Sequence, residues 1–320
     1  MRRTRHDLLD PSSPPPRARG RCALAVVAKA PSAGESKTRL APPLTREEAA
    51  ALSACFLRDT AASVADACAA LGGAAQPVVV YTPAGAEGSF DGLLPEGFAL
   101  LAQRGGGFGE RLWNAARDLF ALGFASACLI DSDSPTLPTR ALVAAVEELS
   151  KPGERVVLGA ADDGGYYLIG MKSAHARLFE EIEWSTPRVA AQTIARAEEC
   201  YLPVALLPAW YDVDDAAALA RLCEELLGGP RETADQTRAE TPCAADAAHA
   251  RGYDAPHTRD FLARLVEREG HARIRPAGVP AGDCAPPAEV GTGSAPVEVS
   301  GPAAADADDE EDARRGGKPL

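Results

Sequence analysis

The chain is poor in the residue patterns that build zinc sites and membrane spans. Its 320 residues include only five His, and none of its eight Cys stands in a C-x-x-C pair, which argues against a zinc site. No apolar run reaches the roughly 18 residues of a membrane span, so we expect none. Most of the Cys lie in apolar segments, which is typical of small core residues in a reducing compartment.

Positive charge is also scarce. The 33 Lys and Arg are outnumbered by 46 Asp and Glu, for a formal net charge of −13. A nucleic-acid binder needs a basic footprint, so we expect no nucleic-acid partner. The acidic balance instead suits a metal-using enzyme, because carboxylates hold hard cations. The apolar run after the basic N-terminus is cut short by Lys29, so we interpret it as a strand rather than a signal peptide and expect a cytoplasmic protein.

Composition divides the chain into four parts. Residues 1–21 are predicted to be a disordered basic arm, and 22–228 the folded domain. Residues 229–269 are predicted to be a linker, whose amphipathic stretch at 254–268 could form a helix that docks on the domain. Residues 270–320 are rich in Pro, Gly, Ala and acid, and are predicted to be a disordered acidic tail.

The folded part alternates strand-like and helix-like segments. Short apolar runs are expected as strands at 23–28, 77–81, 98–101, 127–130, 155–158, 166–171 and 204–207. Helices are expected at 45–71, 109–122, 139–149, 187–200 and 215–227, the first with a capping box of Thr45 and Glu48. This alternation predicts an α/β protein with a mostly parallel sheet covered by helices on both faces. Ligands bind such sheets at the carboxyl ends of the strands.

A basic loop follows the first expected strand. Lys29, Lys37 and Arg39 surround Gly34 and other small residues. Backbone N–H groups and cations in such a loop suit a diphosphate. The loop matches neither the Walker motif nor G-x-G-x-x-G, and the alternative is a solvated basic loop.

Acidic residues follow two other strands. Asp131 and Asp133 come directly after the strand at 127–130, where two carboxylates can share a divalent cation. Asp212 and Asp214, after the last strand, are candidates for further metal ligands. The alternative for Asp131 and Asp133 is an ordinary cap or exposed turn, and Asp215 could be a plain N-cap of the last helix.

Two further segments carry candidate substrate groups. Asp163 precedes Gly164 and Gly165, where it could act as a base while the glycines let a ligand approach, or where the three could simply form a hairpin turn. Trp184, Ser185 and Thr186 stand before a helix. Either hydroxyl residue could be only its N-cap.

Taken in order, these segments resemble one family. The matching residues are Ala28–Pro31, Gly34, Lys37–Leu40, Gln103, Gly109–Arg111, Asp131–Pro135, Leu137–Pro138, Asp163–Gly170, Trp184–Thr186 and Asp212–Asp214. They resemble a bacterial family of nucleotide-diphospho-sugar-transferase-like proteins, long known as a domain of unknown function and associated with arsenosugar biosynthesis. The resemblance covers roughly 22–228. Asp215 departs from it, since the family often has Thr there.

The resemblance implies a GT-A-type, Rossmann-like three-layer sandwich. It implies a divalent cation, Mg²⁺ or Mn²⁺, on the D-x-D-like element, with Asp131, Asp133, Asp212 and Asp214 as its candidate ligands. Nucleotide and phosphate would be bound by residues of the first loop and of the Gly-rich segment, namely Lys29, Gly34, Lys37, Arg39, Gln103 and Arg111. The sugar or acceptor would meet the remaining candidates, namely Asp163, Gly164, Gly165, Trp184, Ser185 and Thr186.

Three functions are compatible with this set. The first is a glycosyltransferase that moves a sugar from a nucleotide-diphosphate donor to a small-molecule acceptor, with Asp163 as the base if the reaction inverts. The second is a nucleotidyltransferase, guanylyltransferase-like, that releases pyrophosphate from a nucleoside triphosphate. The third is a catalytically inactive nucleotide-binding module. The sequence leaves open the donor sugar and base, the acceptor and the oligomeric state.

Overall fold

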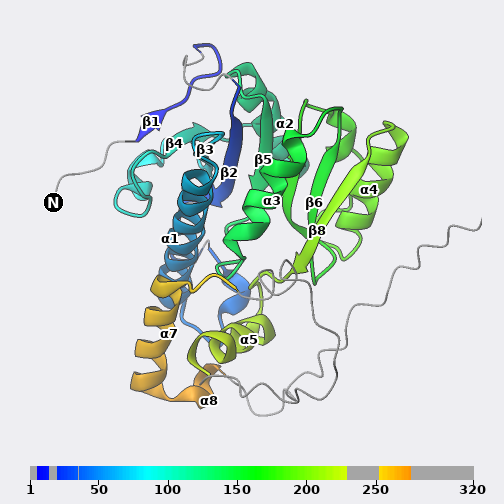
Figure 1. Ribbon diagram of the computed structural model, residues 1–320. Coiled ribbons are helices and arrows are strands. Elements are labelled where there is room, and N and C mark those ends of the chain that lie inside the picture. The colour runs from blue at the N-terminus through cyan, green and yellow to red at the C-terminus, as the bar shows by residue number, and fades with distance from the viewer. Residues whose placement is uncertain (1–5, 14–19, 35, 229–251, 275–320) are drawn as a thin grey trace, which may run out of the picture. The chain divides into compact units, whose positions relative to one another are not determined.

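One sheet organises the part of the chain that the structure describes. The structure, a computed structural model, describes residues 6–13, 20–34, 36–228 and 252–274. Within them, eight strands pair in the order β1-β4-β3-β2-β5-β7-β6-β8 (Figure 1). The strands are β1 Asp7–Leu8, β2 Cys22–Lys29, β3 Ala75–Thr82, β4 Ala99–Ala102, β5 Ser126–Ile130, β6 Val156–Ala161, β7 Tyr166–Met171 and β8 Val204–Trp210.

The helices alternate with these strands along the chain. They are α1 Arg46–Ala70, α2 Phe108–Ala121, α3 Thr139–Ser150, α4 Val189–Glu199, α5 Ala216–Leu227, α7 Pro256–Glu269 and α8 His271–Ile274. The described residues also form three short 3₁₀ helices, η2 Thr38–Leu40, η3 Glu87–Phe90 and η4 Ala176–Phe179. The predicted α/β class and mostly parallel sheet are confirmed.

Strand direction brings the candidate residues to one edge of the sheet. All neighbouring strands are parallel except β7, which is antiparallel to both β5 and β6. The carboxyl ends of β2, β4, β5, β6 and β8 therefore share an edge with the amino end of β7. Loops that are far apart in the sequence meet there.

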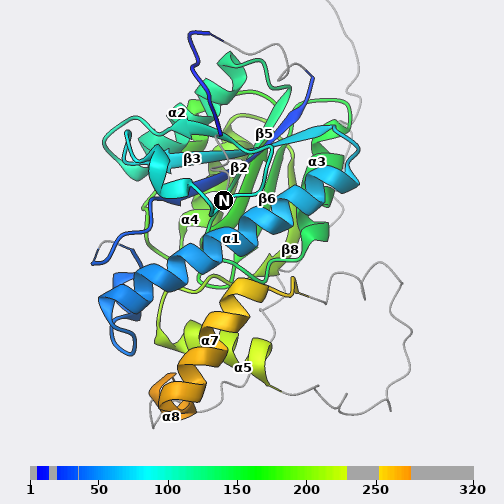
Figure 2. The ribbon, with the colours of Figure 1, turned by 90° about the vertical axis from the view of Figure 1, so that its left-hand side faces the viewer.

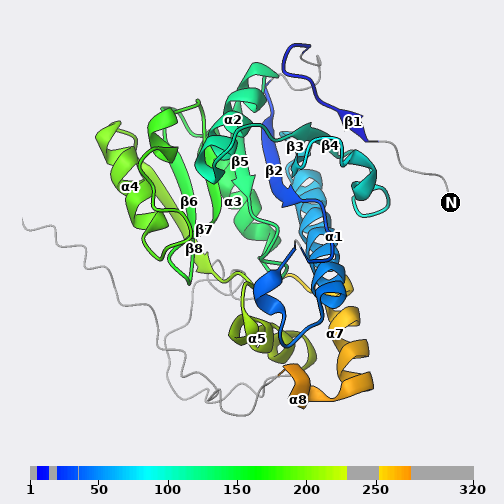
Figure 3. The same ribbon diagram turned by 180° about the vertical axis from the view of Figure 1, so that it is seen from behind.

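Helices cover both faces of the sheet. Alternate residues of β2 point to opposite faces, as a strand's period of two requires. Leu24 and Val26 join the apolar core beneath α1 and α3, whereas Ala23 and Ala25 join the core beneath α2 and α4. Figure 3 shows α2 and α4 on their face, and Figure 1 shows α1 and α3 on the other. This is the expected three-layer arrangement.

Helix α1 begins at the capping box that the sequence predicts. The Thr45 side chain accepts from the Glu48 N–H at 3.1 Å, and the Glu48 carboxylate accepts from the Thr45 N–H at 2.9 Å. This reciprocal pair satisfies two N–H groups that the first turn would otherwise leave unpaired.

Helix α7 packs beside α1 and α5 (Figure 2). Its Leu262 and Leu265 are buried in a third apolar core with residues of α1 and α5. The carboxylate of Asp59, in the middle of α1, accepts from the N–H groups of His257 at 3.1 Å and Thr258 at 2.8 Å. Asp59 thus caps the start of a helix that is distant in sequence.

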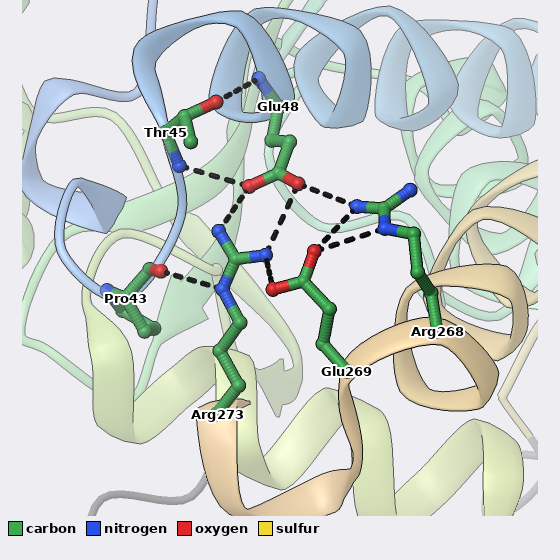
Figure 4. A network of polar contacts seen from close by, with 6 residues as sticks. All are labelled: Pro43, Thr45, Glu48, Arg268, Glu269 and Arg273. Carbon is green, nitrogen blue, oxygen red and sulfur yellow. Dashed lines mark hydrogen bonds and ion pairs between the residues drawn. The ribbon is translucent and has the colours of Figure 1, made fainter.

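A polar network ties the beginning of α1 to α7 and α8. Glu48 accepts from Arg268 at 2.8 Å and also pairs with Arg273, which donates to the carbonyl of Pro43 at 3.2 Å (Figure 4). Glu269 pairs with both arginines. The same Glu48 therefore completes the capping box and anchors the last described helices.

Two segments differ from the sequence-based expectation. Within the expected disordered arm, Asp7–Leu8 form an edge strand, because β4 leaves its outer hydrogen-bonding edge open to them. Within the expected acidic tail, α8 buries Ile274 in the third core. The rest of that tail, residues 275–320, and 229–251 of the linker lie outside the described residues. Across the described ranges, no helix has both the length and the apolar character of a membrane span.

Candidate functional site

Two cavities adjoin at the edge where the parallel strands end. The first, the basic cavity, has a volume of about 350 Å³ and is lined by Lys29, Lys37, Arg39, Gln103 and Arg111 among others. The second, the acidic cavity, has a volume of about 210 Å³ and is lined by Asp131, Asp133, Asp163, Asp212 and Asp214 with apolar and aromatic residues. Asp133 and Asp214 line both cavities, so the two are neighbours.

The structure brings most of the predicted phosphate-binding residues into the basic cavity. Lys29 ends β2, and Gln103 follows β4. The Gln103 side chain donates to the carbonyl of Val80 at 2.7 Å, which fixes its orientation. Gly34 has a φ of 79° in the first loop but does not line either cavity. The positive φ of Gly34 suits a glycine and shapes the loop that carries Lys37 and Arg39.

Arg111 reaches the basic cavity from the first turn of α2. It donates to the carbonyl of Gly106 at 2.9 Å and lies over the ring of Phe108, 5.7 Å from its centroid. Its Nε is buried without a hydrogen-bond partner among the described residues. A bound anion would supply the missing acceptor.

Lys37 is held between two of the predicted metal ligands. Its Nζ lies 2.8 Å from Asp133 Oδ2 and 2.7 Å from Asp214 Oδ1, and its side chain is only 7% exposed. Burial alone would lower the pKa of Lys37, but the two carboxylates outweigh it and the pKa is raised. Arg39 also pairs with Asp214, from a far more open position with its side chain 71% exposed.

Asp131 is the most deeply placed carboxylate of the site. Its Oδ2 accepts from the Ser134 hydroxyl at 2.9 Å, whereas its Oδ1 is buried without a partner among the described residues. Burial, and next the charge of Asp133, raise its pKa well above the ordinary value. Burial, followed by the charges of Asp163 and Asp214, likewise raises the pKa of Asp212 to about 6.

The donor chemistry of this cluster suits a divalent cation. Oxygen ligands are what Mg²⁺ and Mn²⁺ prefer, and the unpartnered Asp131 Oδ1 together with the mutual repulsion of the carboxylates favours a bound positive charge. In the described part of the chain, however, no three His, Cys, Asp or Glu side chains are grouped as a finished metal site. Lys37 engages two of the candidates, Asp133 and Asp214.

The turn between β6 and β7 carries the predicted base. Asp163 Oδ1 accepts from the Gly165 N–H at 2.8 Å, as in a turn, and Asp163 also lines the acidic cavity. The hairpin turn and the position in the cavity are therefore both present. Gly164 has a φ of 89°, and a Cβ there would lie 2.1 Å from the carbonyl oxygen of Pro187. Gly164 therefore permits close packing of the turn against the next loop and does not itself line either cavity.

That next loop brings the remaining candidates to the acidic cavity. Trp184, Ser185 and Thr186 all line it. The Thr186 hydroxyl donates to the carbonyl of Glu183 at 2.7 Å. The N-cap of α4 is Arg188, so neither hydroxyl residue serves as the cap that the sequence left as an alternative. Asp215, by contrast, caps α5 by accepting from the Ala218 N–H at 2.9 Å.

Sequence reasoning missed an aromatic wall of the acidic cavity. Phe108 and Tyr166 flank Trp184, with ring centroids 5.1 Å and 6.4 Å from it in edge-to-face contacts. Gly109 makes this packing possible, because a Cβ there would lie 2.5 Å from Trp184 Nε1. Tyr166 belongs to the same sequence motif as Asp163, and this proximity could have identified it as a residue of the site. Phe108 carried no chemical signal of its own.

The chain matches a bacterial family and a solved structure. Residues 64–186 match the family described as "Uncharacterized protein conserved in bacteria (DUF2064)", which confirms the expected resemblance. A candidate nucleotide-diphospho-sugar transferase from Desulfovibrio desulfuricans G20 is 26% identical. That alignment covers 79% of this chain and 96% of the other, with a TM-score of 0.61. The fold expected from the resemblance is therefore confirmed.

More distant solved structures include two nucleotide-linked synthases. One is a CMP:2-keto-3-deoxy-manno-octonic acid synthetase complexed with CTP, 11% identical over 63% of this chain and 96% of that one, with a TM-score of 0.39. The other is a 4-diphosphocytidyl-2C-methyl-D-erythritol synthase from Anaerococcus prevotii DSM 20548, 10% identical over 62% and 95%, with a TM-score of 0.40. Both likenesses are too loose to bear on function. No curated protein matches the chain.

Proposed function

We propose that the protein is a nucleotide-using transferase that moves a sugar from a nucleotide-diphosphate donor to a small-molecule acceptor. The observation that carries this proposal is the adjacency of a basic and an acidic cavity, which share Asp133 and Asp214. One cavity suits a diphosphate and the other a second substrate, with the reacting bond between them. The likeness to a candidate nucleotide-diphospho-sugar transferase supports the same reading.

The donor diphosphate is assigned to the basic cavity. Lys29, Arg39 and Arg111 supply positive charge, and the partnerless Arg111 Nε offers a buried donor. Gln103 lies beside them and offers polar atoms to a base or ribose. Cations placed around the leaving diphosphate stabilise the charge that it gains as the bond to the sugar breaks.

A divalent cation is assigned to the carboxylates, with Asp131, Asp133, Asp212 and Asp214 as the residues that would hold it. Bound there, Mg²⁺ or Mn²⁺ would supply Lewis-acid stabilisation of the diphosphate. Lys37 would keep Asp133 and Asp214 oriented, since it already contacts both.

Asp163 is assigned as the base on the acceptor side. Its carboxylate is oriented by the Gly165 N–H and lines the acidic cavity. It would take the proton of an acceptor hydroxyl while that oxygen bonds to the sugar carbon. The bond from sugar to diphosphate breaks, and its electron pair leaves with the diphosphate oxygen.

Nucleotidyl transfer is the second candidate, because the three cations of the first loop would also suit a triphosphate. One experiment separates the two. The full chain is incubated with Mg²⁺ or Mn²⁺ and with panels of nucleotide sugars and of nucleoside triphosphates. Release of a nucleoside diphosphate from a sugar donor supports the proposal, and release of pyrophosphate from a triphosphate overturns it in favour of the alternative. Asp133→Asn serves as the inactive control.

A further inference from the structure

The acidic cavity has a one-sided charge. Five of the residues that line it are aspartates, and none of its described lining residues is Lys, Arg or His. Two cations contact its carboxylates, since Lys37 pairs with Asp133 and Asp214 and Arg39 also pairs with Asp214. A divalent cation, Lys37 and Arg39 together would offset four of the five negative charges. The cavity would therefore stay negative even with its cation bound, and would repel an anionic guest.

The rest of the lining of the acidic cavity is mostly aromatic and apolar. Phe108 and Trp184 meet edge to face, and Leu112, Leu129 and Val189 line the same cavity. Aromatic faces attract flat apolar groups and also cations, through the negative face of the ring. The acidic cavity should therefore select its ligand by shape, through these rings, as well as by charge.

A buried hydroxyl provides an independent sign of a ligand. Tyr166 lines the acidic cavity, and its hydroxyl group is buried without a hydrogen-bond partner among the described residues. Buried polar atoms are almost always paired, and those that are not call for a guest or a water molecule. A ligand that brings its own hydroxyl or amine would satisfy it.

We propose that the acceptor is a small molecule that carries no negative charge, with a flat apolar face for Phe108 and Trp184 and a hydroxyl or amine for Tyr166 and the carboxylates. This inference rests on the proposed function, of which it names the acceptor class. It excludes phosphorylated and carboxylic acid acceptors. Those are the acceptors that a nucleotidyltransferase acting on phospho-acids would need.

The test uses three probes that share one ring and differ in charge. Benzyl alcohol, benzylamine and benzoate are titrated into the full chain at neutral pH without nucleotide. The readout is the indole N–H signal of Trp184 in the NMR spectrum, assigned by its loss in Trp184→Phe. We expect the alcohol and the amine to shift this signal, and benzoate to bind at least about tenfold more weakly. Equal binding of benzoate, or no response to any probe, would overturn the proposal.

A pair of adjacent variants tests whether the carboxylates cause the selectivity. Asp163→Asn removes a charge from the cavity while keeping an acceptor for the Gly165 N–H. It should lower the ratio of the affinities for benzylamine and benzoate several-fold. Asp162→Asn is the matched control, because Asp162 pairs with Arg221 at 2.7 Å and does not line the cavity. An equal effect of both variants would contradict a local cause.

The test of the acceptor class can fail or succeed independently of the test of the proposed function. The probes report on the acidic cavity alone, whereas nucleotide binding is measured by a separate titration of a nucleoside diphosphate with Mg²⁺. A chain that binds the diphosphate but admits benzoate refutes the acceptor class and leaves the transferase standing. A chain that rejects benzoate but binds no nucleotide refutes the transferase and leaves the selectivity of the cavity established.

Discussion

The ammonium group of Lys37 lies 2.8 Å from the carboxylate of Asp133, which joins the loop after the first long strand to the loop after β5. The same ammonium reaches Asp214 after β8. Three strand ends are thus cross-linked by one nearly buried charge. This arrangement separates Lys37 from Arg39, two residues that the sequence presents as equivalent.

Lys37→Ala is expected to destabilise the protein. It leaves Asp133 and Asp214 without their shared cation, and loss of one partner of a largely buried pair should cost about 2 kcal/mol or more. Arg39→Ala, at an exposed position, should change the free energy of unfolding by less than about 1 kcal/mol. Urea denaturation of the two variants checks this. Equal stability of both would mean that the Lys37 ion pairs contribute little.

Asp133→Asn is expected to abolish the dependence of nucleotide binding on Mg²⁺ or Mn²⁺. The substitution keeps the shape of the side chain but removes a charge that a divalent cation needs. The fold should survive, because Lys37 keeps its contact with Asp214. Calorimetric titration of nucleotide with and without the metal gives the answer, with Asp215→Asn as the control at a helix cap. A metal response that persists in Asp133→Asn would assign the cation to other carboxylates.

Gly109→Ala is expected to displace Trp184. The new Cβ would lie 2.5 Å from Trp184 Nε1 and 2.9 Å from the backbone oxygen of Phe179, so the ring must move. Overpacking of this kind costs about 1–3 kcal/mol. The matched control is Gly106→Ala, whose Cβ would be 3.6 Å from the Glu110 carboxylate, an ordinary contact. Thermal melting and Trp fluorescence of the two variants should differ, and identical behaviour would rule out tight packing at Gly109.

Glu48 is expected to make the stability of the protein sensitive to acid. Burial pushes the pKa of Glu48 upward, but the hydrogen bond from the Thr45 N–H and the guanidinium of Arg273 outweigh it, and the pKa falls below the ordinary 4.5. The charged form therefore stabilises the folded state. That contribution is fully present above pH 4.5 and is lost as the pH falls through the lowered pKa.

Glu48→Gln measures this contribution. At neutral pH the variant should be less stable than the wild type by about 1 kcal/mol, since it loses charge-assisted hydrogen bonds at a partly exposed site. The difference should shrink as the pH falls below 4.5, because the wild type then loses the same charge. Urea midpoints across this range test it, with exposed Glu47→Gln as the control. A difference that does not vary with pH would exclude the ionised network as its source.

Local pattern was enough to predict most of the strands and helices. Short apolar runs such as Ala23 to Ala28 indicate strands, and Thr45 with Glu48 indicates where α1 begins, because these signals depend only on neighbours along the chain. The carboxylates after β5 and β8 could also be assigned to one edge of the sheet from the sequence, because the carboxyl ends of parallel strands lie at the same edge.

The composition of each cavity was decided by the tertiary structure alone. The neighbouring residues do not indicate that Lys37 would pair with Asp133 and Asp214, or that Gly164 would pack against Pro187. Phe108, Tyr166 and Trp184 meet only because α2, β7 and the loop before α4 converge. Contacts between distant segments follow from how the helices pack on the sheet and from side-chain volume, neither of which is a property of the neighbouring residues in the chain.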